Sequence, residues 1–358
     1  PYQSYSAFAG NPYFIDLDEL KNMGLLEAKD YEDVDWESTD EKVNYGVLYE
    51  KRYPILQKAA IKFLDKPSEE FEKFCKENEE WLPEFALFMA LKDVHEGMQW
   101  SEWKEEYRNR DKEAIGQAKS RYETEINLWK VYQYLFFKQW RELKKYANDR
   151  DIQIIGDLPI YVSLDSVDVW THPELFQLDE NRIPIKVAGC PPDAFSDDGQ
   201  LWGNPLYNWD YMEQTDFQWW INRIQYICKV YDVLRIDHFR GFDSYYAIPY
   251  GEPTAKNGVW KKGPGMKLFN KVEETIGRQH IIAEDLGYLT KSVREMLKES
   301  GFPGMKVLEF AFNSNAVGEN EYLPHNFTEN CVAYAGTHDN NTIEGWFEEI
   351  SEDDAEYA

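Results

Sequence analysis

The chain has 358 residues, enough to bury one large core or two ordinary ones. Its formal net charge of −27, from 66 acidic and 39 basic residues, makes a nucleic acid or an anionic membrane a poor partner and is typical of a soluble surface. No apolar run reaches the roughly 18 residues that a membrane span needs.

The cysteines and aromatic residues narrow the class of protein further. Cys75, Cys190, Cys228 and Cys331 form no C-x-x-C pair, which argues against structural zinc or a disulfide framework and favours a reducing, cytoplasmic location. The 13 Trp and 24 Tyr are numerous. Such rings fill cores, and they also stack on pyranose faces in sugar-binding clefts. Composition does not separate these two interpretations.

The first half of the chain is predicted to be helical. Between about residues 37 and 148, apolar side chains recur every three or four positions, most clearly over 44–64, 81–94 and 126–147. Strand patterns are scarce in this part.

The second half alternates strands with helices. Short apolar runs that end in polar residues predict buried strands at 152–162, 232–239, 280–287, 305–312 and 331–340, with helical patterns such as "KSVREMLKES" between them. This order indicates an α/β fold with a parallel sheet, open or closed into a barrel. Ligands of such folds bind at the carboxyl ends of the strands.

Carboxylates follow several of these predicted strands, namely Asp157, Asp237, Glu284 and Asp339. Arg235 shares a strand face with Asp237, because residues i and i+2 point together, and its charge favours the ionised nucleophile. Glu284 follows an apolar strand, where desolvation favours a protonated general acid. These are the two groups that cleave a glycosidic bond, with retention if they lie ~5 Å apart. Asp339, after His338, would bind sugar hydroxyls and stabilise an oxocarbenium-like state.

Each feature alone has a simpler structural explanation. Arg235 and Asp237 could form an ordinary ion pair, Glu284 and Asp285 could begin a helix, and "THDN" could be a turn. Because four predicted strands end in this way, we favour a catalytic site over these separate structural explanations.

The motifs resemble the amylomaltase family, 4-α-glucanotransferases of the α-amylase clan. The resemblance covers nearly the whole chain and rests on "PYQSYSAFAGNPYFIDL", "IGDLPIYVSLDSVDVW", "VAGCPPDAFSDDGQLWGNPLYNW", "LRIDHFRGF", "IIAEDLG" and "GTHDNNT". It implies a (β/α)8 TIM-type barrel with a largely helical inserted subdomain. Because family members extend beyond both ends of this chain, the barrel is expected to be incomplete, the chain being a fragment.

The resemblance also implies a role for each residue. Asp237 matches the nucleophile, Glu284 the general acid/base and Asp339 the carboxylate that distorts the bound sugar, with His338 beside it. Arg235 matches the arginine that keeps the nucleophile charged, and Asp157 matches a further cleft carboxylate.

Three aromatic side chains are added by the same resemblance. Tyr2 matches a ring that stacks under the sugar, although a frayed chain end is the simpler interpretation. Trp202 belongs to a loop near 164–210 that is expected to arch over the cleft, with a structureless stretch over 189–205. His238 could line the acceptor side or simply be a core or surface histidine.

The predicted organisation has three parts: residues 1–20 line the cleft, 21–128 form the inserted subdomain and 129–358 form the barrel core. The predicted activity is retaining transfer of α-1,4-glucan segments through a covalent β-glucosyl-enzyme. Maltooligosaccharides are the donors, glucose or maltose serves as acceptor, and no cofactor or metal is required. The alternatives are an α-1,4-glucan hydrolase of the same clan, a catalytically dead glycan-binding protein and, less favoured, a metal hydrolase built on Asp237, His238, His338 and Asp339.

Overall fold

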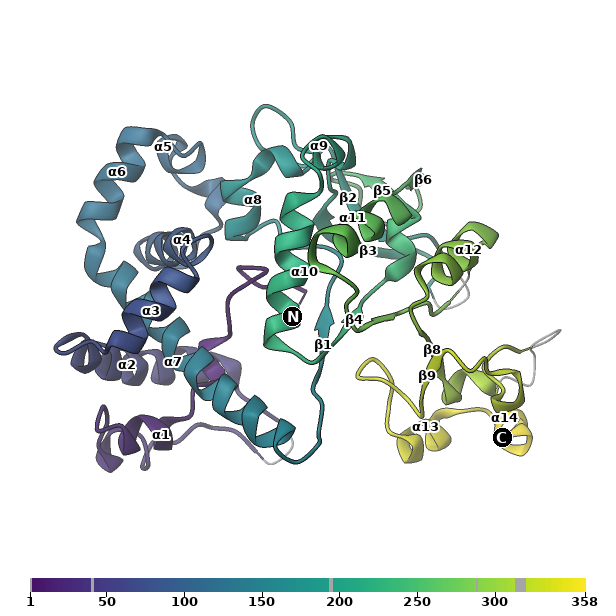
Figure 1. Cartoon of the computed structure of the whole chain (residues 1–358), viewed down its shortest axis with the longest axis horizontal. Helices are drawn as coiled ribbons and strands as arrows, with labels where there is room; N and C mark the ends of the chain where they lie inside the picture. The colour runs from purple at the N-terminus through teal and green to yellow at the C-terminus, as the bar shows by residue number, and fades with distance from the viewer. Residues whose placement is uncertain (1, 40–41, 193–195, 288, 313–319) are drawn as a thin grey trace. The chain divides into compact units, whose positions relative to one another are not determined.

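The computed structural model describes residues 2–39, 42–192, 196–287, 289–312 and 320–358, with residue 357 described by its backbone only. The chain divides into two compact units (Figure 1). The first contains the residues up to Ile152 together with Val162–Ile183. The second contains Gln153–Tyr161 and Pro184–Ala358.

The first unit is helical. Its helices are α1 (Leu17–Asn22), α2 (Tyr45–Leu64), α3 (Glu69–Glu77), α4 (Leu82–Val94), α5 (Glu105–Arg108), α6 (Lys112–Arg121), α7 (Glu123–Asn148) and α8 (Val167–Thr171). The three helical regions predicted from periodicity are therefore confirmed as α2, α4 and α7.

The packing of this unit follows from the side chains of α4 and α7. Almost every residue of α4 between Phe85 and Leu91 is buried, so this helix is apolar on all sides and lies inside the unit. The long helix α7 packs against α2, α3 and α4. Side-chain caps begin several helices: Asn44 accepts the N–H of Val47 at the start of α2, and Ser68 accepts that of Phe71 at the start of α3.

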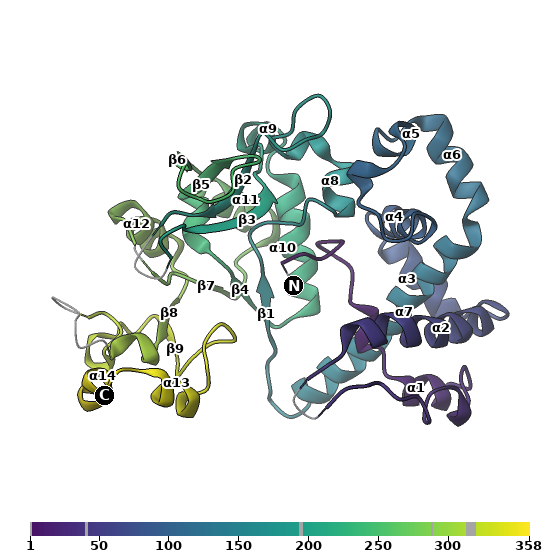
Figure 2. The same cartoon turned by 180° about the vertical axis from the view of Figure 1, so that it is seen from behind.

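The second unit contains a parallel sheet. Its strands β1 (Ile155–Leu158), β4 (Val233–Ile236) and β7 (Ile281–Ala283) are hydrogen-bonded in the order β1-β4-β7 and lie side by side in Figure 2. Asp157 pairs with Arg235 in the register, and Arg235 pairs with Ile282. The connections contain α9 (Trp209–Gln214), α10 (Gln218–Val230) and α11 (Met266–Ile276). Of these, α10 packs on β1 and β4.

Two further parallel strands follow α12 (Lys291–Ser300). They are β8 (Gly304–Val307) and β9 (Cys331–Tyr334), which pair with each other. The N–H of Ala283 in β7 donates to the carbonyl of Pro303, directly before β8, at 2.9 Å. The parallel pair β8–β9 therefore lies beside β7 of the β1-β4-β7 sheet. Helices α13 (Ile343–Glu349) and α14 (Glu352–Tyr357) end the chain.

A four-stranded antiparallel sheet, which was not predicted, completes the unit. It has the order β3-β2-β5-β6, formed by β2 (Lys186–Cys190), β3 (Gln200–Pro205), β5 (Ser244–Pro249) and β6 (Val259–Lys262). The expectation of a structureless stretch over 189–205 is therefore wrong at both ends, because β2 and β3 pair there; residues 193–195 lie outside the described part. The glycines and prolines of this stretch concealed the strand pattern.

The five strands predicted in the second half are confirmed, but each is shorter than predicted. Asp157 lies inside β1, whereas Asp237, Glu284 and Asp339 follow their strands in the loops. Within the residues described, no helix combines the length and the apolar character needed to cross a membrane.

Candidate functional site

Arg235 gathers two carboxylates at the carboxyl end of the parallel sheet. Its Nη1 donates to Asp157 Oδ1 at 2.6 Å and to Asp237 Oδ1 at 3.1 Å. The pairing of Asp157 with Arg235 across β1 and β4, together with the i, i+2 relation of Arg235 and Asp237, places all three side chains on one face. Arg235 Nε donates to Met305 Sδ in β8 at 3.2 Å, so the guanidinium reaches across the sheet.

The protonation of Asp237 departs from the expectation drawn from the sequence. The pKa of Asp237 is raised to about 6, mainly by burial and then by the negative charge of Asp157, with a smaller effect of Asp339. Arg235 does lower this pKa, as expected, but the effect is outweighed. Geometry contributes to this result, because Arg235 makes its shorter contact with Asp157, whose charge also repels Asp237. Asp237 is still mostly ionised at pH 7.

Glu284 stands beside Asp237 on the next strand. Its Oε2 accepts the backbone N–H of His238 at 2.7 Å, and its Oε1 accepts that of Leu286, also at 2.7 Å. Burial raises the pKa of Glu284 to about 7, and the Asp237 charge acts in the same direction, while the two N–H donors and Arg235 oppose both. Each carboxyl oxygen keeps a second lone pair, so Glu284 can carry a proton without losing either bond.

His238 and Trp202 form one wall of this region. The His238 backbone is left-handed, with φ of 50°, which turns the chain directly after Asp237. Its ring meets the Trp202 ring edge to face, with centroids 4.9 Å apart. Burial, with a smaller effect of Arg240, lowers the pKa of His238 to about 3, so the imidazole is neutral and can exchange hydrogen bonds with a hydroxyl.

His338 and Asp339 lie in a turn after β9. The N–H of Asn340 donates to the carbonyl of Thr337, and the N–H and hydroxyl of Thr337 both donate to Asn340 Oδ1 at 2.9 Å. His338 Nε2 lies 3.5 Å from Asp339 Oδ2, and both side chains are more than half exposed. "THDN" is thus a turn, and Asp339 also acts electrostatically on Asp237.

The structure decides one alternative and leaves one residue untested. Glu284 and Asp285 do not begin a helix, because α12 is capped by Thr290, whose Oγ1 accepts the N–H of Val293. Tyr2 lies in the first unit with about a third of its surface exposed, and its stacking role stays a prediction.

One buried carboxylate was not predicted from the sequence. Glu309 follows β8 in "MKVLEFAF", two residues after the strand ends at Val307, and it is buried. The rule that ligands bind at the carboxyl ends of parallel strands is the signal that could have identified Glu309. No group of three or more His, Cys, Asp or Glu side chains suits a metal ion within the described ranges.

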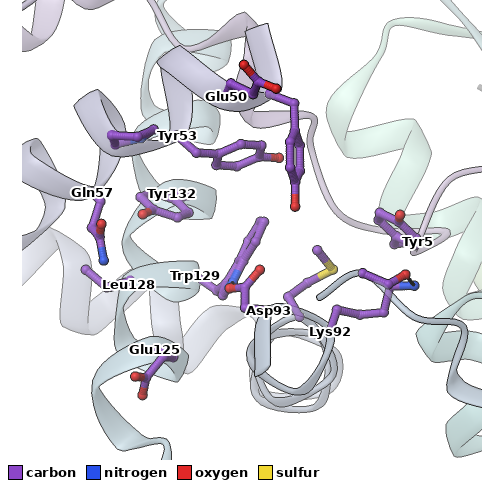
Figure 3. A pocket seen from close by; sticks show the side chains of 14 residues that line it. Tyr5, Glu50, Tyr53, Gln57, Lys92, Asp93, Glu125, Leu128, Trp129 and Tyr132 are labelled. Atoms are coloured by element: carbon purple, nitrogen blue, oxygen red, sulfur yellow. Dashed lines mark hydrogen bonds between the residues drawn. The ribbon is translucent and has the colours of Figure 1, made fainter. Parts of the chain in front are cut away.

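A separate cavity of about 430 Å³ lies in the first unit, shown in Figure 3. Aromatic rings such as Tyr53, Trp129 and Tyr132 line it, and Trp129 Nε1 donates to Asp93 Oδ2 at 2.6 Å. None of the candidate residues on the strand ends lines this cavity.

Comparison with known proteins shows which family the chain resembles. The sequence model of glycoside hydrolase family 77, described as 4-alpha-glucanotransferase, matches residues 1–358. A 4-alpha-glucanotransferase of Clostridium butyricum is 52% identical over 97% of this chain and 71% of its own length. One from Streptococcus pneumoniae is 49% identical over 100% of this chain and 71% of its own.

Solved structures give the same result. The amylomaltase of Streptococcus agalactiae in complex with acarbose superimposes with a TM-score of 0.96 at 48% identity, covering 100% of this chain and 72% of that one. The resemblance inferred from the motifs is confirmed. The chain therefore belongs to the 4-α-glucanotransferase family, glycoside hydrolase family 77.

Proposed function

We propose that this enzyme is a retaining 4-α-glucanotransferase that works by double displacement on α-1,4-glucans. The observation that carries the proposal is the junction of β4 and β7. There, Glu284 accepts a hydrogen bond from the residue next to Asp237, and the two carboxyls differ in pKa in the required order.

In the first step, an ionised Asp237 oxygen attacks the anomeric carbon of the donor glucose. The bond from that carbon to the glycosidic oxygen breaks, and Glu284 gives its proton to the departing oxygen. The product is a β-glucosyl ester of Asp237 and a shortened glucan. Glu284 is now a carboxylate, so its charge is ready to act as a base.

In the second step, the 4-hydroxyl of an acceptor glucan loses its proton to Glu284 and attacks the same carbon. The ester bond breaks and Asp237 leaves as a carboxylate, which restores the starting state with net retention. Asp339 would hydrogen-bond the sugar ring hydroxyls, with His338 beside it. His238 and Trp202 would line the acceptor side, and Tyr2 would stack under the donor sugar.

The same proposal extends to the architecture and the location. The parallel sheet β1-β4-β7, with the parallel pair β8–β9 beside it, supports a (β/α)8 barrel architecture. We propose the organisation into residues 1–20, 21–128 and 129–358 on this basis. A cytoplasmic location is supported by four free cysteines without C-x-x-C spacing.

Incubation with maltotriose tests the proposal against its alternatives. Transfer gives a ladder of shorter and longer glucans while the total number of reducing ends stays constant. A steady rise in reducing ends would favour the hydrolase instead, and amylose binding without any product would favour the dead glycan-binding protein. Loss of activity on chelation would contradict pure carboxylate chemistry.

A further inference from the structure

The carboxyl group of Glu309 is buried without an obvious function. Only 6% of the residue is exposed, and within the part of the chain that the structure describes, Oε1 has neither solvent contact nor a hydrogen-bond partner. Burial raises the pKa of Glu309, which favours the neutral acid. A buried polar atom left without a partner is costly, so such a group calls for an explanation.

The position of Glu309 links it to the turn that carries Asp339. Val307, the last residue of β8, pairs with Tyr334, the last residue of β9. Immediately beyond this pair, the N–H of Glu309 donates to the carbonyl of Ala335 at 3.2 Å. The backbone of Glu309 thus continues the hydrogen bonding between β8 and β9 up to the start of the turn.

The side chain of Glu309 fills the space behind that turn. A methyl group placed on Gly336 would lie 2.7 Å from Glu309 Oε1, a distance that real side chains do not tolerate, and 3.2 Å from Asn340 Cβ. Gly336 and the carboxyl group therefore occupy complementary volumes. The next residues, Thr337 to Asn340, are joined by their own hydrogen bonds, so a displacement of Gly336 is passed on to this turn.

We propose that Glu309 is a positioning residue for the glucanotransferase reaction, whose side chain supports the 336–340 turn and so holds Asp339 toward the bound sugar. The inference rests on the proposed function, because it assumes that Asp339 acts on the sugar. Since Oε1 has no hydrogen-bond partner among the described residues, this oxygen contributes through the space that it fills beside Gly336.

This reasoning makes opposite predictions for two substitutions. Glu309→Gln keeps the shape and the neutral state, so kcat should stay within about twofold of the parent. Glu309→Ala leaves a void that lets the turn relax, so kcat should fall about tenfold or more while KM changes little, because the loss is one of transition-state stabilisation. Glu299→Gln removes an exposed carboxylate of α12 and serves as the control.

Gly336→Ala tests the same contact from the other side and does not remove the carboxyl group. It should lower kcat alone, since its methyl group pushes against Glu309. In the double variant Glu309→Ala with Gly336→Ala, the methyl group enters the vacated space, so the loss should be smaller than the product of the two single losses. Thermal midpoints of all variants show which remain folded, and Gly336→Ala remains informative if Glu309→Ala does not fold.

Three outcomes would overturn the inference: equal damage from Glu309→Gln and Glu309→Ala, two single losses that simply multiply, or a loss found entirely in KM. Failure of the proposed function is separate, since it would appear as the absence of a maltotriose ladder in the unsubstituted chain. A normal ladder with an unimpaired Glu309→Ala variant would refute the role of Glu309 alone.

Discussion

Asp157→Asn is the most direct test of how the nucleophile is tuned. In the present structure Asp157 acts on Asp237 in two ways: its charge raises the pKa of Asp237, and it takes the shorter contact with Arg235. Asparagine removes the negative charge while keeping the size of the side chain. Arg235 then has Asp237 as its remaining ionised partner on Nη1. Both changes lower the pKa of Asp237.

The size of the effect follows from the geometry. Because Asp157 and Asp237 bind one nitrogen at 2.6 and 3.1 Å, their contacting oxygens cannot be far apart. At about 6 Å and an effective dielectric constant of about 20, two unit charges repel by about 3 kcal/mol, which corresponds to an upper limit of about 2 pKa units. Arg235 screens this repulsion, and burial is the larger cause of the raised pKa. We therefore expect a decrease of about 1 unit.

The assay is the pH dependence of kcat/KM, which reports ionisations of the free enzyme. The parent should show an acid limb near the pKa of Asp237, about 6, and an alkaline limb near that of Glu284, about 7. In Asp157→Asn the acid limb should move down by about 1 pH unit. The alkaline limb should move less, because burial and the charge of Asp237 are the largest causes of the raised pKa of Glu284.

The control is Asp210→Asn, which removes an exposed carboxylate of α9 and should move neither limb. An acid limb that stays near 6 in Asp157→Asn would show that Asp157 does not set the charge of Asp237. An acid limb that moves to higher pH would show that Asp157 lowers the pKa of Asp237, which is the opposite of the effect expected here.

The remaining predictions concern the two reacting carboxyl groups. Asp237→Asn should lower turnover by more than about 10³-fold with glucan binding largely kept, since covalent attack alone is removed; calorimetry with a maltooligosaccharide measures the second part, and lost binding would contradict it. Glu284→Gln should retain the first step best with glucosyl fluoride, which needs no proton; equal losses on fluoride and glucan would argue against an acid role. Glu284→Gln should also be more stable than the parent at pH 8, by about 1 to 3 kcal/mol, and similar at pH 4. The pKa of Glu284 is raised from 4.5 to about 7, so its contribution to stability is present below 4.5 and lost as the pH rises through 7; urea unfolding at the two pH values checks this, and a less stable variant at pH 8 would refute it.

The strand ends could be predicted from the sequence because their signal is local. An apolar run followed by Asp237 or Glu284 needs only the alternation of a strand and the rule that parallel strands end together. The structure places both residues at those ends, and Asp157 of β1 pairs with Arg235 of β4 in the register. Local pattern was sufficient for these parallel strands.

The strength of the interactions could not be predicted in the same way. That Arg235 prefers Asp157 to Asp237 depends on two distances, 2.6 and 3.1 Å, which no spacing in the sequence encodes. The antiparallel sheet was not predicted for a related reason. Its strands carry glycine and proline, and Gly189 is required because a methyl group there would lie 2.1 Å from the carbonyl oxygen of Gln200. This close contact between Gly189 and the backbone of Gln200 arises only when the two strands pair, so the sequence of one strand does not reveal it.

The separation of roles between Asp237 and Glu284 depends on how each charge is compensated. Burial raises the pKa of both groups; the charge of Asp157 adds to this effect on Asp237, and the charge of Asp237 adds to it on Glu284. Asp237 accepts a hydrogen bond from the positively charged Arg235, whereas Glu284 accepts hydrogen bonds from the backbone N–H groups of His238 and Leu286. A cation favours the ionised form more strongly than a neutral donor does, so this difference favours ionised Asp237 and leaves the proton on Glu284, as the proposed roles require.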